Sequence, residues 1–299
     1  MKKIILSLGM IVFVGAIVIG ATGAFFSDTE TSTDNTFTAG AIDLQIDNES
    51  YYNSQFSQNT SWGLKDLMIE RFFDFSDVKP GDDGEDTISL HVNNNASWLC
   101  ADVTLTSNND NTCTEPEGTD ESDNTCGLPD PDAGELANNI EFIWWADDGD
   151  NVLEDGENLL PPTQGGALGS LGVGGVAHVT LADSSNNIWT GGSNNPIPAN
   201  EQSPRHIAKA WCFGDIAAVP LPQNSKDSSL NQNWSPATDN DGGDNEGNGV
   251  VNELDGGFSC SGASSANNVT QTDSFTADIS FYAVQSRNNT DFLCSNPRT

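Results

Sequence analysis

The chain has 299 residues and a formal charge of −34, because 44 Asp and Glu outnumber 10 Lys and Arg. A surface this acidic repels phosphate backbones and anionic headgroups, which excludes a nucleic-acid binder and favours cations or other copies of the protein as partners. The same charge is typical of disordered chains, but 36% apolar residues with 7 Trp and 14 Phe are enough to build a core.

The N-terminus has the pattern of a secretory signal peptide. Lys2 and Lys3 precede an apolar run over residues 4–21, and small residues follow as far as Ala24. We expect a signal peptidase to cut between Ala24 and Phe25, so that the chain meets a membrane only through residues 1–24, before cleavage. The alternative is an uncleaved anchor, since the run approaches the ~18 residues that span a bilayer. Cleavage removes two lysines and no acid, which takes the charge from −34 to −36.

Secretion makes the six cysteines candidates for disulfides, because thiols oxidise outside the cytoplasm. Cys113 and Cys126 flank one polar loop and are expected to pair locally. The other four cysteines allow three connectivities. We favour Cys212 with Cys260, which closes a long polar stretch, and Cys100 with Cys294, which ties a strand to the C-terminus. No pair has the Cys-x-x-Cys spacing typical of zinc sites.

Apolar and polar residues alternate with a period of two along most of the mature chain, which predicts β-strands. Strands are expected at residues 42–47, 87–92, 103–105, 140–145, 176–181, 206–212 and 275–283. In each strand that alternates cleanly, one face should contact the core and the other should face water. Residues 64–73 hint at a short helix.

Long polar stretches rich in Asn, Asp, Ser and Gly separate these strands, at residues 107–138, 146–158, 183–204 and 222–273. Strands divided by turn chemistry predict an all-β fold, a jelly-roll-like antiparallel β-sandwich with long inserted loops. We expect one such domain over residues 41–299, preceded by a separate segment at residues 25–40.

That segment, which begins FFSDTETSTDNTFT, reads as a strand at the start of the mature chain. One face is neutral and compact; it includes Phe25, Ser27, Thr29, Thr31, Thr33 and Phe37. The opposite face carries Asp28 and Glu30 and should stay in water. A terminal strand of this kind can pair with an exposed sheet edge of a second molecule. The alternative is a flexible secreted tail.

The sequence GATGAFFSDTETSTDNTFTAGAIDLQID at residues 20–47, with VKPGD at residues 78–82 and the strand at 87–93, resembles the TasA/camelysin family. The resemblance implies a secreted jelly-roll subunit that polymerises into biofilm-matrix fibres or pili. It further implies a dedicated signal peptidase that cuts before Phe25 and a donor strand over residues 25–38 that completes the next subunit's sheet. The chain departs from the family's fibre subunits in its acidity and its six cysteines.

Residues 244–255 resemble a calcium-binding loop of EF-hand type. Asp244, Glu246, Asn248, Val250 and Asp255 fall at positions 1, 3, 5, 7 and 12, with Gly249 at the turn. Alternate oxygen ligands before a sharp glycine turn are what calcium needs. Flanking helices are not evident, so a solvated linker is the alternative.

A second candidate loop follows the strand that ends in Trp144 and Trp145. Asp148, Asp150, Glu154 and Glu157 can converge on one ion if the chain turns at the glycines between them. Carboxylates this close repel one another unless a cation or a proton neutralises them. We expect calcium as a structural cofactor that makes these loops rigid.

No catalytic residue is indicated, although camelysin-related proteins are sometimes classed as metallopeptidases. His91, His178 and His206 form no His-Glu-x-x-His motif, and no Gly-x-Ser-x-Gly elbow occurs. We therefore rank a peptidase third. The second hypothesis is a secreted module that binds carbohydrate or a surface through calcium-organised loops, with Trp62, Trp98 or Trp189 as stacking platforms.

Overall fold

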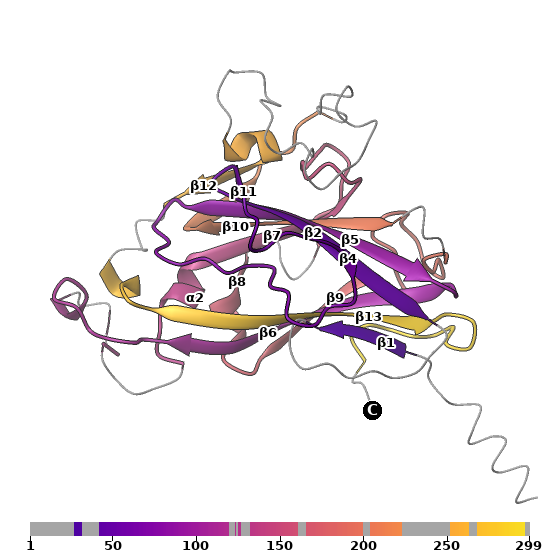
Figure 1. The fold of residues 1–299 in the computed structure, drawn as a ribbon, viewed down its shortest axis with the longest axis horizontal. Coiled ribbons are helices and arrows are strands. Elements are labelled where there is room, and N and C mark those ends of the chain that lie inside the picture. The colour runs from indigo at the N-terminus through magenta and orange to yellow at the C-terminus, as the bar shows by residue number, and fades with distance from the viewer. Residues whose placement is uncertain are drawn as a thin grey trace, which may run out of the picture.

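The fold is given by a computed structural model of the chain (Figure 1). The structure describes residues 27–31, 42–119, 123, 125–126, 132–160, 166–199, 204–222, 252–262 and 268–296. The expected signal segment, with its cleavage site between Ala24 and Phe25, lies outside the described residues. Within the described ranges, no helix combines the length and the apolar character needed to cross a membrane.

Two antiparallel sheets form a sandwich, as the alternating pattern predicted (Figure 1). The first sheet has the spatial order β1 (Ser27–Thr31), β13 (Ser274–Gln285), β6 (Ser97–Asn109) and β9 (Val176–Ala182). The second has the order β3 (Gln55–Phe56), β2 (Asp43–Tyr52), β5 (Asp83–Asn93), β10 (Arg205–Phe213), β7 (Ile140–Asp147) and β8 (Gly166–Ala167), and β4 (Trp62–Lys65) also pairs with β2. A separate small pair joins β11 (Asp215–Ala218) to β12 (Phe258–Ser261).

The helices among the described residues are short and lie in the connections between strands. They are α2 (Leu136–Asn139) and the 3-10 helices η1 (Glu117–Thr119), η2 (Leu168–Leu171), η4 (Glu253–Gly256) and η5 (Asn268–Thr270). The expected helix at residues 64–73 is wrong. That segment leaves β4 and places Leu67 and Phe72 in the core while Met68 and Ile69 stay exposed. Its apolar residues are therefore separate anchors of an irregular chain and not one face of a helix.

Every predicted strand is present, but the expectation of one wet face per strand is wrong for the middle of the larger sheet. All eleven residues of β5 are buried. The inner row, which includes Ile88 and Leu90, packs against the opposite sheet. Residues 57–61 also fold over β2 on this inner side, because Asn48, which pairs with Ile88, donates from Nδ2 to Thr60 O at 2.7 Å.

A second apolar cluster covers the outer side of β7 and β10. Phe258 from β12 and Ile216 from β11 pack there against Trp145 and Ala210. The small sheet thus acts as a lid, and the sandwich has a core on both sides of its larger sheet. Such additional cover explains why polar residues in these strands are buried and must find partners within the protein.

An ion pair lies inside the main core. Lys209 on β10 and Asp86 on β5 are directly opposite in the sheet, and their Nζ and Oδ2 atoms are 2.8 Å apart. Both side chains are fully buried, and burial raises the pKa of Asp86. Ser50 Oγ donates to the other oxygen of Asp86 at 3.1 Å. The pair replaces hydrophobic packing at the centre of the sandwich with a directional contact between neighbouring strands.

Candidate polymerisation edge and metal centre

Strand β1 lies at the edge of the four-stranded sheet, against β13 (Figure 1). The pairing is antiparallel, and its register joins Ser27 to Val284 and Thr31 to Ser280. The segment singled out by its alternation therefore forms a strand, though the described strand is shorter than residues 25–38. Phe25, Thr33 and Phe37 lie outside the described residues. The sequence left open which edge of a second molecule would accept this segment; within this chain it pairs with β13.

The register of β1 pairs Asp28 with Ala283 and Glu30 with Phe281. Ala283 and Phe281 belong to the main core.

β1 covers only part of this edge. Its partners are residues 280–284, whereas β13 starts at Ser274. A hollow of about 830 Å³ adjoins the uncovered part, and it is lined by aromatic side chains that include Phe73, Phe75, Trp211 and Phe275. Among the described residues, the first half of β13 has a strand partner on its β6 side only.

The outer face of β13 carries a third apolar cluster. Trp98 on β6 and Tyr282 on β13 pack there with Phe292 from the C-terminal segment, and Trp98 Nε1 donates to Asn289 O at 2.6 Å. The disulfide between Cys100 and Cys294 lies in the same cluster. The end of the chain is therefore fastened across the strand that accepts β1.

All three disulfides join the cysteines that the sequence paired. The Cα atoms are 5.7 Å apart in Cys100–Cys294, 5.2 Å in Cys113–Cys126 and 5.4 Å in Cys212–Cys260. Cys212 belongs to β10 and Cys260 to β12, so this bond holds the small sheet on the larger one.

The acidic loop after β7 gathers the carboxylates that the sequence proposed as metal ligands. Oxygens of Asp148, Asp150 and Glu154 lie within 4.8 Å of one another, and so do those of Asp147, Asp148 and Glu157. The two groups share Asp148. Asp147, which is the last residue of β7, had not been proposed as a ligand.

Hydrogen bonds orient these carboxylates. Asp147 Oδ2 accepts the backbone N–H groups of Gly149 at 2.9 Å and Asn151 at 3.3 Å, and Glu157 Oε2 accepts that of Glu154 at 2.9 Å. The second oxygens, Asp147 Oδ1 and Glu157 Oε1, are buried without a hydrogen-bond donor among the described residues. Burial and the neighbouring acids raise the pKa of Glu157 to about 8 and that of Asp147 well above its usual range.

Oxygen ligands alone, several of them anionic, suit a hard cation such as calcium. An unpaired anionic oxygen is costly to bury, and a divalent cation removes that cost together with the mutual repulsion. The chemistry of the loop thus fits the expected calcium.

The EF-hand-like loop falls largely outside the described residues, which include none of Asp244, Glu246, Asn248 and Val250. Asp255 is described, and it is buried in η4. Its Oδ2 accepts the backbone N–H of Asn252 at 2.9 Å as part of a capping box. One oxygen of the proposed position-12 ligand is therefore engaged in holding a helical turn.

The histidines each contact a neighbouring strand. His91 Nε2 lies 2.9 Å from Asp47 Oδ2, and His178 Nδ1 lies 2.9 Å from Asp102 Oδ1. His206 Nδ1 lies 3.1 Å from Ser89 Oγ. In the described part of the chain, no cluster with the geometry of a metal site contains a histidine.

The proposed stacking platforms differ in exposure. Trp98 is buried in the outer cluster of β13, so its assignment as an exposed platform is wrong. Trp62 and Trp189 are half-buried. Trp189 lines a hollow of about 520 Å³ that also borders Asp147, Asp148, Glu157 and His206.

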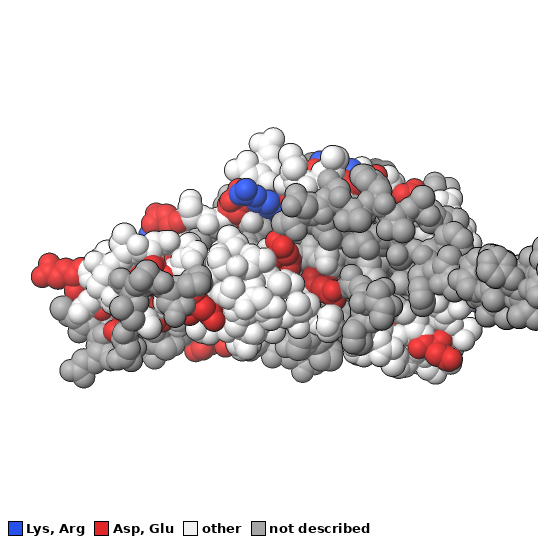
Figure 2. Space-filling view, turned by 90° about the horizontal axis from the view of Figure 1, so that it is seen from below, with Lys and Arg blue, Asp and Glu red and all other residues white. Residues whose placement is uncertain are grey.

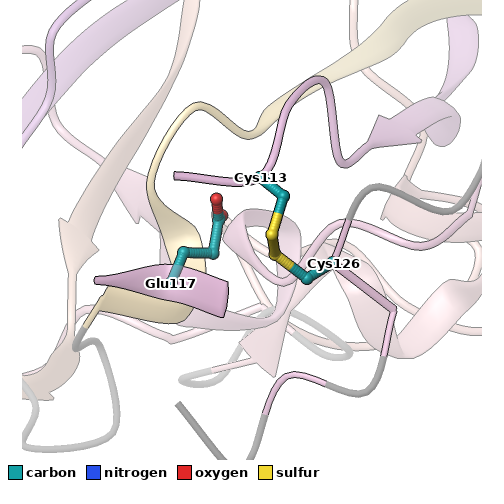
Figure 3. A group of neighbouring side chains, drawn as sticks. All are labelled: Cys113, Glu117 and Cys126. Atoms are coloured by element: carbon teal, nitrogen blue, oxygen red, sulfur yellow. A yellow bond between two sulfur atoms is a disulfide. The ribbon is translucent and has the colours of Figure 1, made fainter. Parts of the chain in front are cut away.

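A further acidic group was missed by the sequence. Oxygens of Asp110, Glu117 and Asp273 lie within 4.8 Å of one another. Glu117 lies beside the Cys113–Cys126 disulfide (Figure 3), whose sulfurs are bonded to each other and so are not free to bind metal. The chain separation between Asp110 and Asp273 hides the group. Asp110 lies in the polar stretch 107–138 and Asp273 at the end of the stretch 222–273, and no local pattern links the two.

The chain was compared with known protein families and with curated proteins, and it matches no family model and no curated protein.

Proposed function

We propose that this protein is a secreted structural subunit that polymerises into extracellular fibres by donating its N-terminal strand to the sheet edge of the next subunit. The observation that carries the proposal is the pairing of β1 with the edge strand β13. A strand held only at a sheet edge and joined to its domain by a connection is the element that subunits exchange.

The connection is long enough for exchange. Residues 32–42 separate Thr31 from the start of β2, and fully extended they span about 36 Å at ~3.3 Å per residue. Asp43 pairs with Asn93 at the end of β5, and β6 begins four residues later at Ser97, opposite Gln285. When β1 pairs within its own chain, the connection therefore has to lead back toward Gln285, the end of β13 beside which β1 also begins. A strand donated to a neighbour would not need to reverse direction in this way.

The uncovered half of β13 offers the larger gain. When the register that pairs Thr31 with Ser280 is continued, residues 33–37 would pair with residues 274–278. Exchange would thus add backbone hydrogen bonds along the part of β13 that β1 leaves uncovered.

Calcium has a structural part in this proposal. A cation bound by Asp147, Asp148 and Glu157 would neutralise the loop after β7. In the same loop, Leu153 N–H donates to Gly256 O, and Leu153 O accepts the N–H of Leu221. The ion would hold these connections against the larger sheet. The donor strand β1 and the acceptor strand β13 belong to the four-stranded sheet and would not be affected.

Cysteine cross-linking between two separate chains tests the donation. One preparation carries Thr31→Cys and the other Ser280→Cys, since these positions are paired in the register. After the two are mixed and assembled, we expect a disulfide-linked dimer on a non-reducing gel. The matched control replaces Ser280→Cys by Thr276→Cys, which lies on the same strand outside the β1 pairing and should cross-link far less.

Deletion of residues 25–37 supplies the complementary test. We expect a folded monomer that forms no fibres by electron microscopy, since the acceptor edge remains and the donor is gone. Fibres that persist after this deletion, or equal cross-linking at both cysteine positions, would sink the proposal.

A second function is favoured by one observation, the hollow in which Trp189 borders the acidic loop. A cation there and an aromatic face beside it are the usual parts of a site for sugar hydroxyls. Glycan binding that disappears with chelator, and with Trp189→Ala, in a protein that remains monomeric would establish this function in place of polymerisation.

A further inference from the structure

The group formed by Asp110, Glu117 and Asp273 joins three segments at one end of the four-stranded sheet. Asp110 follows the last residue of β6, Asp273 precedes the first residue of β13, and Glu117 begins η1 in the insertion between β6 and α2. Asn109 pairs with Ser274 at the end of the ladder, which brings Asp110 and Asp273 together. Their oxygens and those of Glu117 lie within 4.8 Å of one another.

Glu117 points to a ligand because its carboxylate is only half satisfied. The side chain is fully buried, and Oε2 accepts the backbone N–H of Thr114 at 2.9 Å. Oε1 has no hydrogen-bond donor among the described residues. A buried anionic oxygen that faces two other carboxylates and has no donor of its own requires a cation or a proton.

Asp273 has the same arrangement. Its Oδ2 accepts the backbone N–H groups of Glu135 at 2.6 Å and Leu136 at 3.0 Å. Its Oδ1 is buried without a donor in the described part of the chain. Backbone groups thus fix one oxygen of each carboxylate and turn the other toward the same space.

Two more acids stand beside this group. Thr125 Oγ1 lies 3.0 Å from Glu135 Oε1 and 3.2 Å from Asp123 Oδ1, and Glu135 Oε2 and Asp123 Oδ2 are again buried without donors among the described residues. Burial and the neighbouring acids raise the pKa of Asp273 to about 7. No Lys or Arg side chain forms an ion pair with Glu117, Asp273, Asp123 or Glu135 in the described ranges, so a cation from solution is the partner that would neutralise them.

We propose that Asp110, Glu117 and Asp273 bind a divalent cation of calcium type, with Asp123 and Glu135 completing its surroundings. The donors are oxygens throughout, and three convergent carboxylates match the ligands that calcium favours over softer metals. The adjacent disulfide anchors the insertion that carries Glu117 (Figure 3). The ion would fasten this insertion to the first residue before β13.

The test uses the whole mature protein with its disulfides intact, stripped of metal, and titrates it with CaCl₂ by calorimetry. Wild type is compared with Glu117→Gln, which retains the Thr114 contact but removes the charge. The matched control is Glu115→Gln, an exposed acid two residues away. We expect the number of bound calcium ions to fall by one in Glu117→Gln and to stay unchanged in Glu115→Gln.

Thermal unfolding separates an ion site from an ordinary structural acid. Without metal, Glu117→Gln should raise the Tm, because a repelling charge is lost. With saturating calcium the same variant should have a lower Tm than wild type, because one bound ion is lost. Asp273→Asn should give the same reversal, which keeps the test informative if one variant fails to fold. An unchanged calcium count, or Tm shifts of the same sign in both conditions, would overturn the proposal.

Discussion

Lys209 neutralises a carboxylate that the folded structure buries, that of Asp86. Its ammonium group and the Asp86 carboxylate are both fully buried at a distance of 2.8 Å. Neither charge has access to water, so each depends on the other. Such a pair contributes modestly compared with good hydrophobic packing, but half of it alone is very unfavourable.

We predict that Lys209→Met destabilises the protein by about 3–5 kcal/mol, because it leaves Asp86 buried without its counter-charge. The double variant Lys209→Met with Asp86→Leu should recover most of that loss. Urea unfolding of the three proteins measures the effect. A double variant as unstable as the single one would show that the pair has a further role.

The acidic loop after β7 gives the metal-free protein a pH dependence. Burial, with repulsion from Asp150 and Asp148, raises the pKa of Glu157 from 4.5 to about 8. Between these values the folded state retains a proton that the unfolded state has released. The contribution of Glu157 to the free energy of unfolding should therefore be most favourable below pH 4.5 and should decrease as the pH rises to 8.

Urea unfolding of metal-free protein across this pH range tests the sign. Glu157→Gln should flatten the dependence, because the group that titrates is gone. Saturating calcium should flatten it as well, since the ion takes the place of the proton. A stability that increases with pH in the absence of metal would contradict the assignment.

At the scale of elements, the disulfides differ in the length of chain they close. Cys100–Cys294 joins residues 194 apart, whereas Cys113–Cys126 joins residues 13 apart. On the chain-entropy estimate the two bonds stabilise by roughly 5 and roughly 3 kcal/mol. Replacing Cys100 and Cys294 by Ala should therefore lower the Tm more than replacing Cys113 and Cys126 by Ala. Calorimetry of the two double variants compares them directly.

The sequence predicted elements well where the information is local. Alternation identified all seven strands it proposed, because a period of two survives in each strand by itself. The carboxylates of residues 148–157 were found for the same reason, as they lie within one loop. Residues 64–73 misled because Leu67 and Phe72 are spaced loosely enough to suggest a helical face although each is an isolated anchor.

Features that depend on distant segments were out of reach. Ser89 and His91 read as a wet face, but they are buried because insertions cover the larger sheet. The Asp110, Glu117 and Asp273 group forms only when β6 and β13 pair, which no local pattern reveals. No local pattern marks Asp86 and Lys209 as a pair, because they meet only where β5 and β10 align.

At the scale of the whole molecule, the acidic charge would oppose the proposed association of subunits. Acidic side chains occur in separate groups over the face seen from below, where Lys and Arg are few (Figure 2). Removal of residues 1–24 would change the formal charge from −34 to −36, because Lys2 and Lys3 are lost. Subunits of one sign repel one another over a Debye length of ~30 Å at 0.01 M salt and ~8 Å at 0.15 M.

We predict that fibres assemble slowly at 0.01 M salt and faster at 0.15 M, as followed by light scattering. Calcium chloride should accelerate assembly more than sodium chloride of equal ionic strength, because bound ions neutralise charge that screening only attenuates. Equal rates in the two salts would limit the effect to screening, and faster assembly at low salt would contradict it.

The positions of β1 and β13 at opposite ends of the chain also set an order in time. On the proposed function, a chain exported from its N-terminus would present β1 outside the cell before residues 274–285 had crossed the membrane. During that interval the strand's own acceptor does not yet exist on the outside. The only β13 edge it can meet belongs to a subunit that has already finished folding, so export itself would favour growth of an existing fibre over closure of a single chain.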